Sequence, residues 1–189
     1  MCARSWAFMR LKKRAADLPQ LQGLPPVVAA NTRLVVLGSF PGVTSLQARQ
    51  YYGHPHNHFW PLMGAMWGVD LMAQPYEWRV QTLLDHGVGL WDVYASCRRQ
   101  GSLDAAIHDV QVNDLNQLRL LAPGLLAVAH NGGESARAGQ RTGQTAALGL
   151  TVHHLPSTSR ANASWSFERK RQAWALALAS AGFDVSISG

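Results

Sequence analysis

One short stretch gathers many of the residues in this sequence that could do chemistry. Residues 38–60 read GSFPGVTSLQARQYYGHPHNHFW and contain paired tyrosines, three histidines and an asparagine. His54, His56 and His58 stand two residues apart, a spacing that would place metal ligands on one face of a strand. Pro55 interrupts that strand spacing, and the stretch holds no Asp or Glu to complete a hydrolytic metal site. We therefore expect no resident metal or cofactor, and keep a histidine-based metal-dependent hydrolase as an alternative.

The same stretch has two other chemical interpretations, a phosphate site and a site for a flat ring. The turn GSFPG at 38–42 lacks the lysine and the third glycine of the common phosphate-binding loops, so it supports a phosphate site only weakly. Tyr51 and Tyr52 precede Gly53, and a tyrosine ring on such a loop can stack on a nucleic-acid base. Packing against the core is the alternative role for both tyrosines.

The composition limits the class of protein and the kind of partner. The chain has 189 residues, of which 47% are hydrophobic and 15% charged, as expected for one globular domain. A net charge of +6 favours a polyanionic partner, because each neutralised phosphate releases counterions. Five of the basic residues lie near the start of the chain, at Arg4, Arg10, Lys12, Lys13 and Arg14.

The cysteine count and the apolar runs indicate a cellular location. Only Cys2 and Cys97 are present, too few for a disulfide framework. No apolar run is long enough to span a membrane, and the first residues lack the pattern of a secretory signal. We therefore expect a cytoplasmic protein, with residues 1–30 as a basic leader and connector and residues 31–189 as a single domain.

Strand-like and helix-like segments alternate along the rest of the chain. Short β-branched runs predict strands at 33–38, 87–94, 125–130 and 150–156. Periodic apolar residues predict helices at 57–68, 76–87, 112–123, 133–141 and 166–182. Asn57 and Ser166 are expected to cap the first and last of these helices, and Gly68 and Gly182 to end them.

This alternation predicts an α/β fold, a three-layer α/β/α arrangement with a central four-stranded, mainly parallel sheet. Ligands of such sheets bind at the carboxyl ends of the strands. The segments expected to meet there are 38–57, 91–98, 130–135 and 155–163.

Two motifs occupy these predicted strand ends. The first is the stretch at 38–60, and the second is LPSTSRANA at 155–163. Together they resemble the uracil-DNA glycosylase superfamily, most closely its hypoxanthine-DNA glycosylases and more distantly its mismatch-specific uracil glycosylases. The resemblance covers roughly residues 30–182. It implies a monomeric DNA-repair enzyme that removes deaminated bases from DNA by base flipping and hydrolysis, and it leaves open whether the base is hypoxanthine, uracil or xanthine.

The resemblance also implies roles for residues of the first motif. Asn57 matches the catalytic polar residue of the hypoxanthine branch, although a helix cap is its alternative role. Tyr52 matches the ring that stacks on the extruded base, and Ser39 lies in the turn of the motif. Phe40, assigned here to the base pocket, stands where most branches carry an Asp or Asn that orients water.

Two further residues follow predicted strands and are candidates for contacting the base. Asp92 stands where related enzymes keep an asparagine that reads the base edge, and a carboxylate can accept from the N1–H of hypoxanthine. A solvated or helix-capping role is the alternative for Asp92. Asn131 could face the pocket, or could serve in a turn that needs positive φ.

The second motif resembles the loop with which the superfamily enters the minor groove and grips the DNA backbone. Ser157 and Ser159 would donate hydrogen bonds to phosphates, and an ordinary hydroxyl-stabilised turn is the alternative. Leu155 replaces a His or Asn that stabilises the leaving base, and Arg160 replaces an expected proline. The remaining expected DNA contacts of this loop are Thr158 and Asn162.

The chemistry expected of the pocket is simple hydrolysis. Its segments contain no lysine that could form a Schiff base, which predicts a monofunctional glycosylase. A non-catalytic nucleic-acid-binding protein on the same fold is the second function, motivated by apolar Phe40 and Leu155 at positions that are usually polar.

Overall fold

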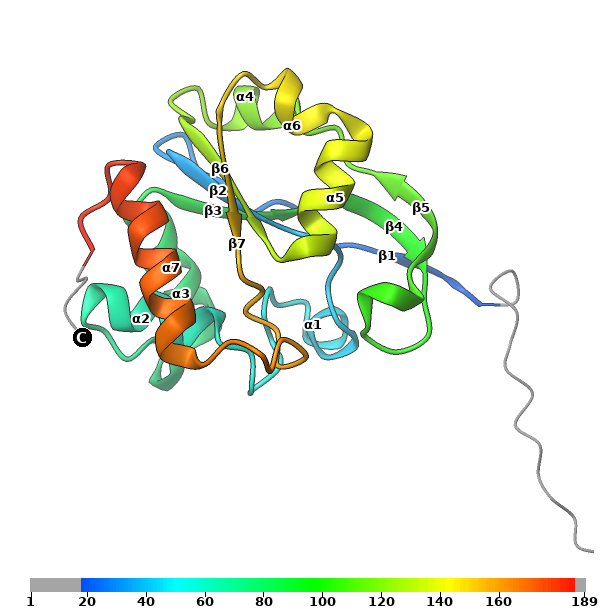
Figure 1. Ribbon diagram of the computed structural model, residues 1–189, viewed down its shortest axis with the longest axis horizontal. Helices are drawn as coiled ribbons and strands as arrows, with labels where there is room; N and C mark the ends of the chain where they lie inside the picture. The colour runs from blue at the N-terminus through cyan, green and yellow to red at the C-terminus, as the bar shows by residue number, and fades with distance from the viewer. Residues whose placement is uncertain (1–17, 186–189) are drawn as a thin grey trace, which may run out of the picture.

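A computed structural model describes residues 18–185, which form a four-stranded parallel sheet and a smaller antiparallel sheet (Figure 1). The parallel sheet has the order β3-β2-β6-β7. Its strands are β2 (Leu34–Gly38), β3 (Val88–Asp92), β6 (Ala127–Asn131) and β7 (Thr151–Leu155). Nearly all residues of β2, β3 and β6 are buried, as expected for parallel strands covered on both faces. The predicted four-stranded parallel sheet is confirmed.

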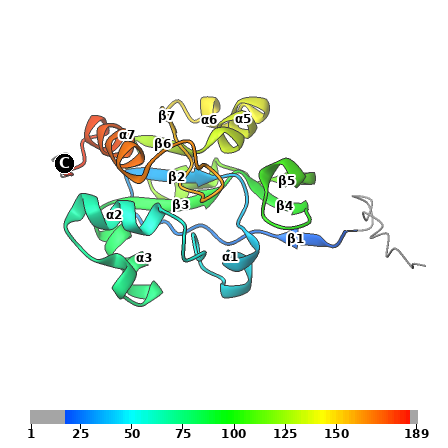
Figure 2. The same ribbon diagram turned by 60° about the horizontal axis from the view of Figure 1, so that its bottom comes forward.

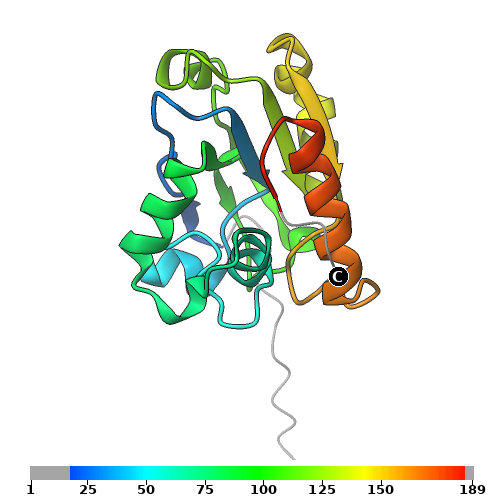
Figure 3. The ribbon, with the colours of Figure 1, turned by 90° about the vertical axis from the view of Figure 1, so that its left-hand side faces the viewer.

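Helices cover both faces of this sheet, and β2 shows why. Leu34 and Val36 point into one hydrophobic cluster, and Val35 and Leu37 point into the other. The first cluster is filled by side chains of α2 (Phe59–Trp67), α3 (Tyr76–Asp85) and α7 (Phe167–Ser180), which lie together in Figure 3. The second is filled from α4 (Gln117–Leu121), α5 (Gly133–Thr142) and the turn after α6 (Gln144–Ala147). The three-layer arrangement is therefore confirmed.

The antiparallel sheet is a feature that the sequence did not reveal. It joins β1 (Gln20–Gln22), β4 (Tyr94–Arg98) and β5 (His108–Val112) in the order β1-β4-β5. β5 is exposed along its whole length and β1 is short and polar, so neither has the alternation that identifies a strand. β4 follows β3 almost directly, so the strand predicted at 87–94 contains β3 and reaches the first residue of β4. The described part of the predicted connector thus contains β1.

Some predicted helix boundaries differ from the structure. α2 begins at Phe59, so His58 occupies the capping position. The predicted capping residue, Asn57, lies one residue before it. The helix predicted at 112–123 is shortened to α4, since Asn113 donates its backbone N–H to Val93 O and ties that segment to the sheet. The predicted cap of α7 is confirmed, because Ser166 Oγ accepts from the Arg169 backbone N–H at 3.2 Å.

The predicted leader lies mostly outside the described residues, and so do its basic residues from Arg4 to Arg14. Within residues 18–185, no helix combines the length and the apolar character needed to cross a membrane.

Candidate active site

A cavity of about 600 Å³ opens at the carboxyl ends of the parallel strands. Its walls come from the segments after β2, β3, β6 and β7, together with α1 (Val43–Ala48) and the helical turn η3 (Asp104–Ala106). These elements lie along the lower edge of Figure 1 and come forward in Figure 2. The cavity brings together all the predicted site residues, which are Ser39, Phe40, Tyr52, Asn57, Asp92, Asn131, Ser157, Thr158, Ser159, Arg160 and Asn162.

Asp92 lies at the end of β3, beside the end of β2. Gly38 pairs with Asp92 in the register of the two parallel strands. A Cβ atom on Gly38 would lie 2.2 Å from Asp92 Oδ1, so the carboxyl group lies directly over the glycine backbone. Only glycine leaves room for this side chain at the end of β2.

The surroundings of Asp92 favour its neutral form. Asp92 is 4% exposed, and within the described residues its Oδ2 has no hydrogen-bond partner. Burial and the negative charge of Asp104 raise the pKa of Asp92 to about 7, against smaller opposing effects of the Tyr51 hydroxyl and the Arg99 guanidinium. The group therefore titrates near neutral pH inside the cavity.

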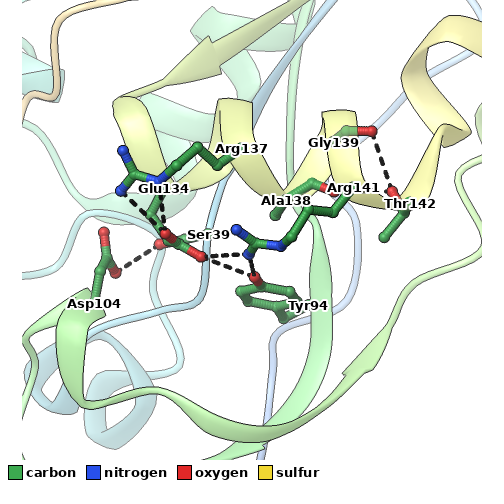
Figure 4. Close-up of polar contacts among 9 residues, drawn as sticks. All are labelled: Ser39, Tyr94, Asp104, Glu134, Arg137, Ala138, Gly139, Arg141 and Thr142. Atoms are coloured by element: carbon green, nitrogen blue, oxygen red, sulfur yellow. Dashed lines mark hydrogen bonds and ion pairs between the residues drawn. The ribbon is translucent and has the colours of Figure 1, made fainter.

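Asp104, which lines the cavity from η3, was missed in the sequence. Its Oδ1 accepts a hydrogen bond of 2.7 Å from Ser39 Oγ, as Figure 4 shows. Ser39 is a predicted site residue, and its hydroxyl hydrogen is thus donated to Asp104. The segment 99–107 gave no recognisable strand or motif, so nothing in the sequence indicated that it folds back against the first motif.

Phe40 is an apolar, buried residue at a position where most branches carry a polar group. Phe40 borders the cavity, but its side chain is 6% exposed and packs in the hydrophobic cluster with Leu37 and Trp91. The Arg99 guanidinium lies 5.1 Å from the ring centroid and donates to Pro41 O. Phe40 therefore packs in this cluster and also borders the cavity.

Tyr52 presents a ring to the cavity on a strained loop. Its backbone adopts φ 54°, and its ring stacks on Phe59 with centroids 4.0 Å apart and planes 21° apart. Tyr51 differs, because it is buried and its hydroxyl donates to the carbonyl oxygens of Leu24 and Pro25, both at 3.2 Å. Both tyrosines therefore pack in or against the hydrophobic core and also line the cavity.

Asn57 lines the cavity and also bonds to the backbone at the start of α2. Its side chain lines the cavity, and its Oδ1 accepts from the Phe59 backbone N–H at 2.9 Å. This bond satisfies one of the unpaired donors at the start of α2 and fixes the plane of the amide. An amide oxygen has two lone pairs, so one acceptor position remains.

Asn131 joins the loop after β6 to the loop after β7. Its Nδ2 donates to Thr158 Oγ1 at 2.8 Å, and its Oδ1 accepts from the Thr158 backbone N–H at 2.9 Å. Thr158 is fully buried, so its side chain holds the loop in place and does not lie on the surface that DNA would meet. The loops approach so closely that a Cβ on Gly132, at φ 102°, would lie 2.8 Å from Ser157 Cβ.

The loop 156–163 presents hydroxyl and cationic groups at the cavity rim. Ser157 Oγ accepts from the Ser159 backbone N–H, and Ser159 Oγ accepts from the Ala161 backbone N–H, both at 3.2 Å. Each oxygen is thus used as an acceptor, which leaves each O–H able to donate. Arg160 is exposed, and Asn162 Nδ2 donates to Ser157 O at 3.1 Å.

A second polar group missed in the sequence lies on α5. Glu134 and Arg137 line the cavity, and Glu134 receives hydrogen bonds from the Tyr94 hydroxyl at 2.9 Å and from Arg141 at 2.8 Å (Figure 4). Arg137 donates to the other carboxylate oxygen of Glu134 at 3.1 Å. These bonds hold the pKa of Glu134 below its usual value despite the opposing effect of its burial. The segment 130–135 was expected at the strand ends, but Asn131 was the one residue in it named as a candidate, so Glu134 was not identified.

The histidines of the first motif are not gathered into a metal site. In residues 18–185 there is no group of three or more His, Cys, Asp or Glu side chains that could hold a metal ion. His58 does not line the cavity, and its Nδ1 lies 3.5 Å from the buried Lys170 Nζ. Lys170 Nζ is also 3.4 Å from Ser159 O, so it connects α7 to the loop at the rim.

Comparisons with known proteins agree with this arrangement. The sequence model of the Uracil DNA glycosylase superfamily matches residues 25–178. The chain is 39% identical over 156 residues to the "Hypoxanthine DNA glycosylase" of Methanosarcina barkeri, covering 82% of this chain and 96% of that protein. It is 36% identical over 151 residues to the protein of the same name from Methanosarcina acetivorans, covering 80% and 94%.

A solved structure shows the same fold. The solution NMR structure of a candidate uracil DNA glycosylase from Methanosarcina acetivorans superposes with a TM-score of 0.75 at 34% identity. The match covers 87% of this chain and 99% of that one. The architecture is therefore shared over most of the two chains.

Proposed function

The chain belongs to the uracil DNA glycosylase superfamily and is a DNA glycosylase, and we propose that it removes hypoxanthine from DNA as a monofunctional hydrolase. The observation that carries this proposal is the cavity of about 600 Å³ in which both motifs meet around Asp92, Tyr52 and Asn57. A cavity of this size can hold one extruded nucleotide.

Tyr52 is proposed to stack on the extruded base. Phe59 already covers the ring of Tyr52 at 4.0 Å, so the tyrosine is held in a fixed plane beside the cavity. A purine placed against the cavity side of this ring would extend the aromatic stack by one layer. Extrusion costs less at a mispair, which favours deoxyinosine or deoxyuridine over a correctly paired nucleotide.

Asp92 is proposed to read the Watson–Crick edge of the base in its neutral form. A carboxylic acid offers a carbonyl oxygen that accepts from N1–H of hypoxanthine and an O–H that donates to O6. Its pKa of about 7 makes this form available near neutral pH. As the N9–C1′ bond breaks, its electron pair passes to the base, and the O–H donor at O6 stabilises the growing negative charge.

Asn57 is proposed to orient the water that attacks C1′ of the oxocarbenium-like sugar. Its amide plane is fixed by the Phe59 N–H, and its remaining acceptor position can hold a water hydrogen. Lys170 is absent from the residues that line the cavity, and no other lysine lies in the described range, which supports hydrolysis without a Schiff base.

The DNA backbone is proposed to lie along the rim loop, with Ser157, Ser159 and Arg160 as its contacts. Hydroxyl and guanidinium donors position phosphates without reading sequence. We further propose that the protein acts as a monomer in the cytoplasm. The free Cys97 and the small number of cysteines support a reducing compartment.

The experiment is single-turnover base release from oligonucleotides that carry deoxyinosine, deoxyuridine or deoxyxanthosine. We expect release of hypoxanthine, unchanged in the presence of EDTA. Release of no base, with DNA binding retained, would instead support the non-catalytic nucleic-acid-binding alternative. Activity lost in EDTA and restored by a divalent metal would support the hydrolase alternative.

A further inference from the structure

An extruded nucleotide leaves a gap in the base stack, and enzymes that bend or open duplex DNA commonly fill such a gap with an apolar side chain. The loop 156–163 offers no large apolar side chain for this purpose. Its exposed members at the cavity are Arg160 and Ala161, one charged and one small. The side chain that enters the stack must therefore come from another part of the rim.

Leu103 is the large apolar side chain in the right place. Ten such side chains are exposed among residues 18–185, and of these Leu103 is the one that lines the cavity. It is 63% exposed, in the segment between β4 and β5. Single exposed leucines are ordinary, so exposure alone would carry no weight. Its position at the mouth of the cavity is what distinguishes it.

The backbone around Leu103 is fixed on both sides. Ser102 Oγ accepts from the Val43 backbone N–H at 3.0 Å, and Asp104 Oδ1 accepts from Ser39 Oγ at 2.7 Å. Leu103 itself has extended dihedrals, φ −79° and ψ 133°. Side chains alternate along an extended backbone, so the two neighbours face the first motif while Leu103 projects away from it.

This arrangement resists the movement that would bury the leucine. The Leu103 carbonyl accepts from the Ala106 backbone N–H at 3.0 Å, which closes the turn of η3 behind it. These bonds fix the backbone of the turn, so Leu103 keeps its place beside the cavity. A rigid support is what insertion between stacked bases requires, because a mobile side chain would lose more entropy on insertion.

We propose that Leu103 is the wedge of this enzyme, the side chain that enters the base stack of duplex DNA and fills the space vacated by the extruded nucleotide. The inference rests on the proposed glycosylase function. Leu103 acts on the duplex and not on the glycosidic bond, so it is a positioning residue. Replacing Leu103 should slow base release when the base must be extruded from duplex DNA. It should have little effect when the base is already unstacked.

The test compares Leu103→Ala on duplex and single-stranded substrates that carry one deoxyinosine. Single-turnover release from the duplex should fall about tenfold or more, and release from the single strand should change less than about twofold. Leu103→Met keeps a long apolar side chain and should retain most of the duplex rate. Leu120→Ala is the matched control, because Leu120 is 82% exposed on α4 and does not line the cavity.

A second measurement follows extrusion without chemistry. A duplex with a non-cleavable deoxyinosine analogue and an adjacent 2-aminopurine should brighten with the wild type and much less with Leu103→Ala. Duplex release by Leu103→Ala within twofold of wild type would overturn the proposal. So would equal losses on duplex and single strand, which would place Leu103 in the pocket. No base release by the wild type from any substrate would instead overturn the proposed function, and this inference with it.

Discussion

Asn131 and Thr158 hold each other through two hydrogen bonds, one from the Asn131 amide to the Thr158 hydroxyl and one from the Thr158 backbone to the Asn131 amide oxygen. The pair fastens the rim loop to the end of β6. Asn131→Ala leaves a fully buried hydroxyl and a backbone N–H without partners, so we expect unfolding free energy to fall by about 1–3 kcal/mol. Urea denaturation of the wild type and the variant measures this difference in unfolding free energy.

The control for this substitution is Asn116→Ala. Asn116 is exposed, and its amide bonds only Asp114 two residues away, so its loss should cost less than about 0.5 kcal/mol. Base release by Asn131→Ala should also fall, since the loop proposed to contact DNA is no longer fixed. Equal stability of the two variants would contradict the role given to the pair.

Asn57→Ala and Asn57→Ser separate the capping role of Asn57 from its role at the sugar. A serine oxygen can still accept from the Phe59 N–H, so Asn57→Ser should stay close to the wild type in stability. It is too short to orient the water, and we expect both variants to lose about 10²-fold or more in single-turnover release. Activity near the wild-type level in Asn57→Ser would assign Asn57 to capping alone.

Asp92→Asn tests which protonation state reads the base. Asparagine offers an acceptor and a donor at all pH values. Aspartic acid offers both only in its neutral form, which predominates below its pKa. The wild-type rate should therefore fall as pH rises through about 7, while the rate of Asp92→Asn stays level. The measurement is single-turnover release between pH 5.5 and 9. A wild-type rate that rises over this range, with an inactive variant, would show that the carboxylate is the active form.

The same group should also make stability depend on pH. The pKa of Asp92 rises from 3.8 to about 7 on folding, so between these values the folded state binds more protons than the unfolded state. Its contribution to stability is thus retained below pH 3.8 and lost progressively as pH rises to 7. Three pKa units correspond to about 4 kcal/mol, which is the largest loss expected. The difference in unfolding free energy between wild type and Asp92→Asn, followed from pH 5 to 8, isolates this effect.

The sequence predicted the parallel sheet because its strands are short, apolar and bounded by glycine or by helix signals. It placed the first and second motifs at one edge for the same reason, and the cavity contains every residue selected there. It did not predict β5 or η3, whose exposed and polar residues carry no periodic signal. Asp104 and Leu103 reach the cavity through that segment, so they could not be found by pattern.

The sequence also did not predict the direction of individual side chains, and Phe40 is an example. Its type indicated that a polar group is missing from the first motif, but not where its ring goes. The direction of one side chain depends on contacts that form only in the folded protein, here with Leu37, Trp91 and the Arg99 guanidinium. The burial of Thr158 was likewise not predictable from the sequence, because it accompanies hydrogen bonds to Asn131, which lies at the end of another segment.

The close contact of Asp92 with Gly38 fixes one side of the pocket, whereas other lining residues can be substituted without changing the sheet. The carboxyl group lies on the backbone of the sheet itself, so its position follows from strand register and moves only if the sheet moves. The walls, by contrast, come from loops and from the short helical elements between them. A shift in preference among deaminated bases should therefore arise by replacing wall residues around a fixed floor, and directed evolution of this enzyme has most freedom in the segments 39–57, 99–107 and 156–163.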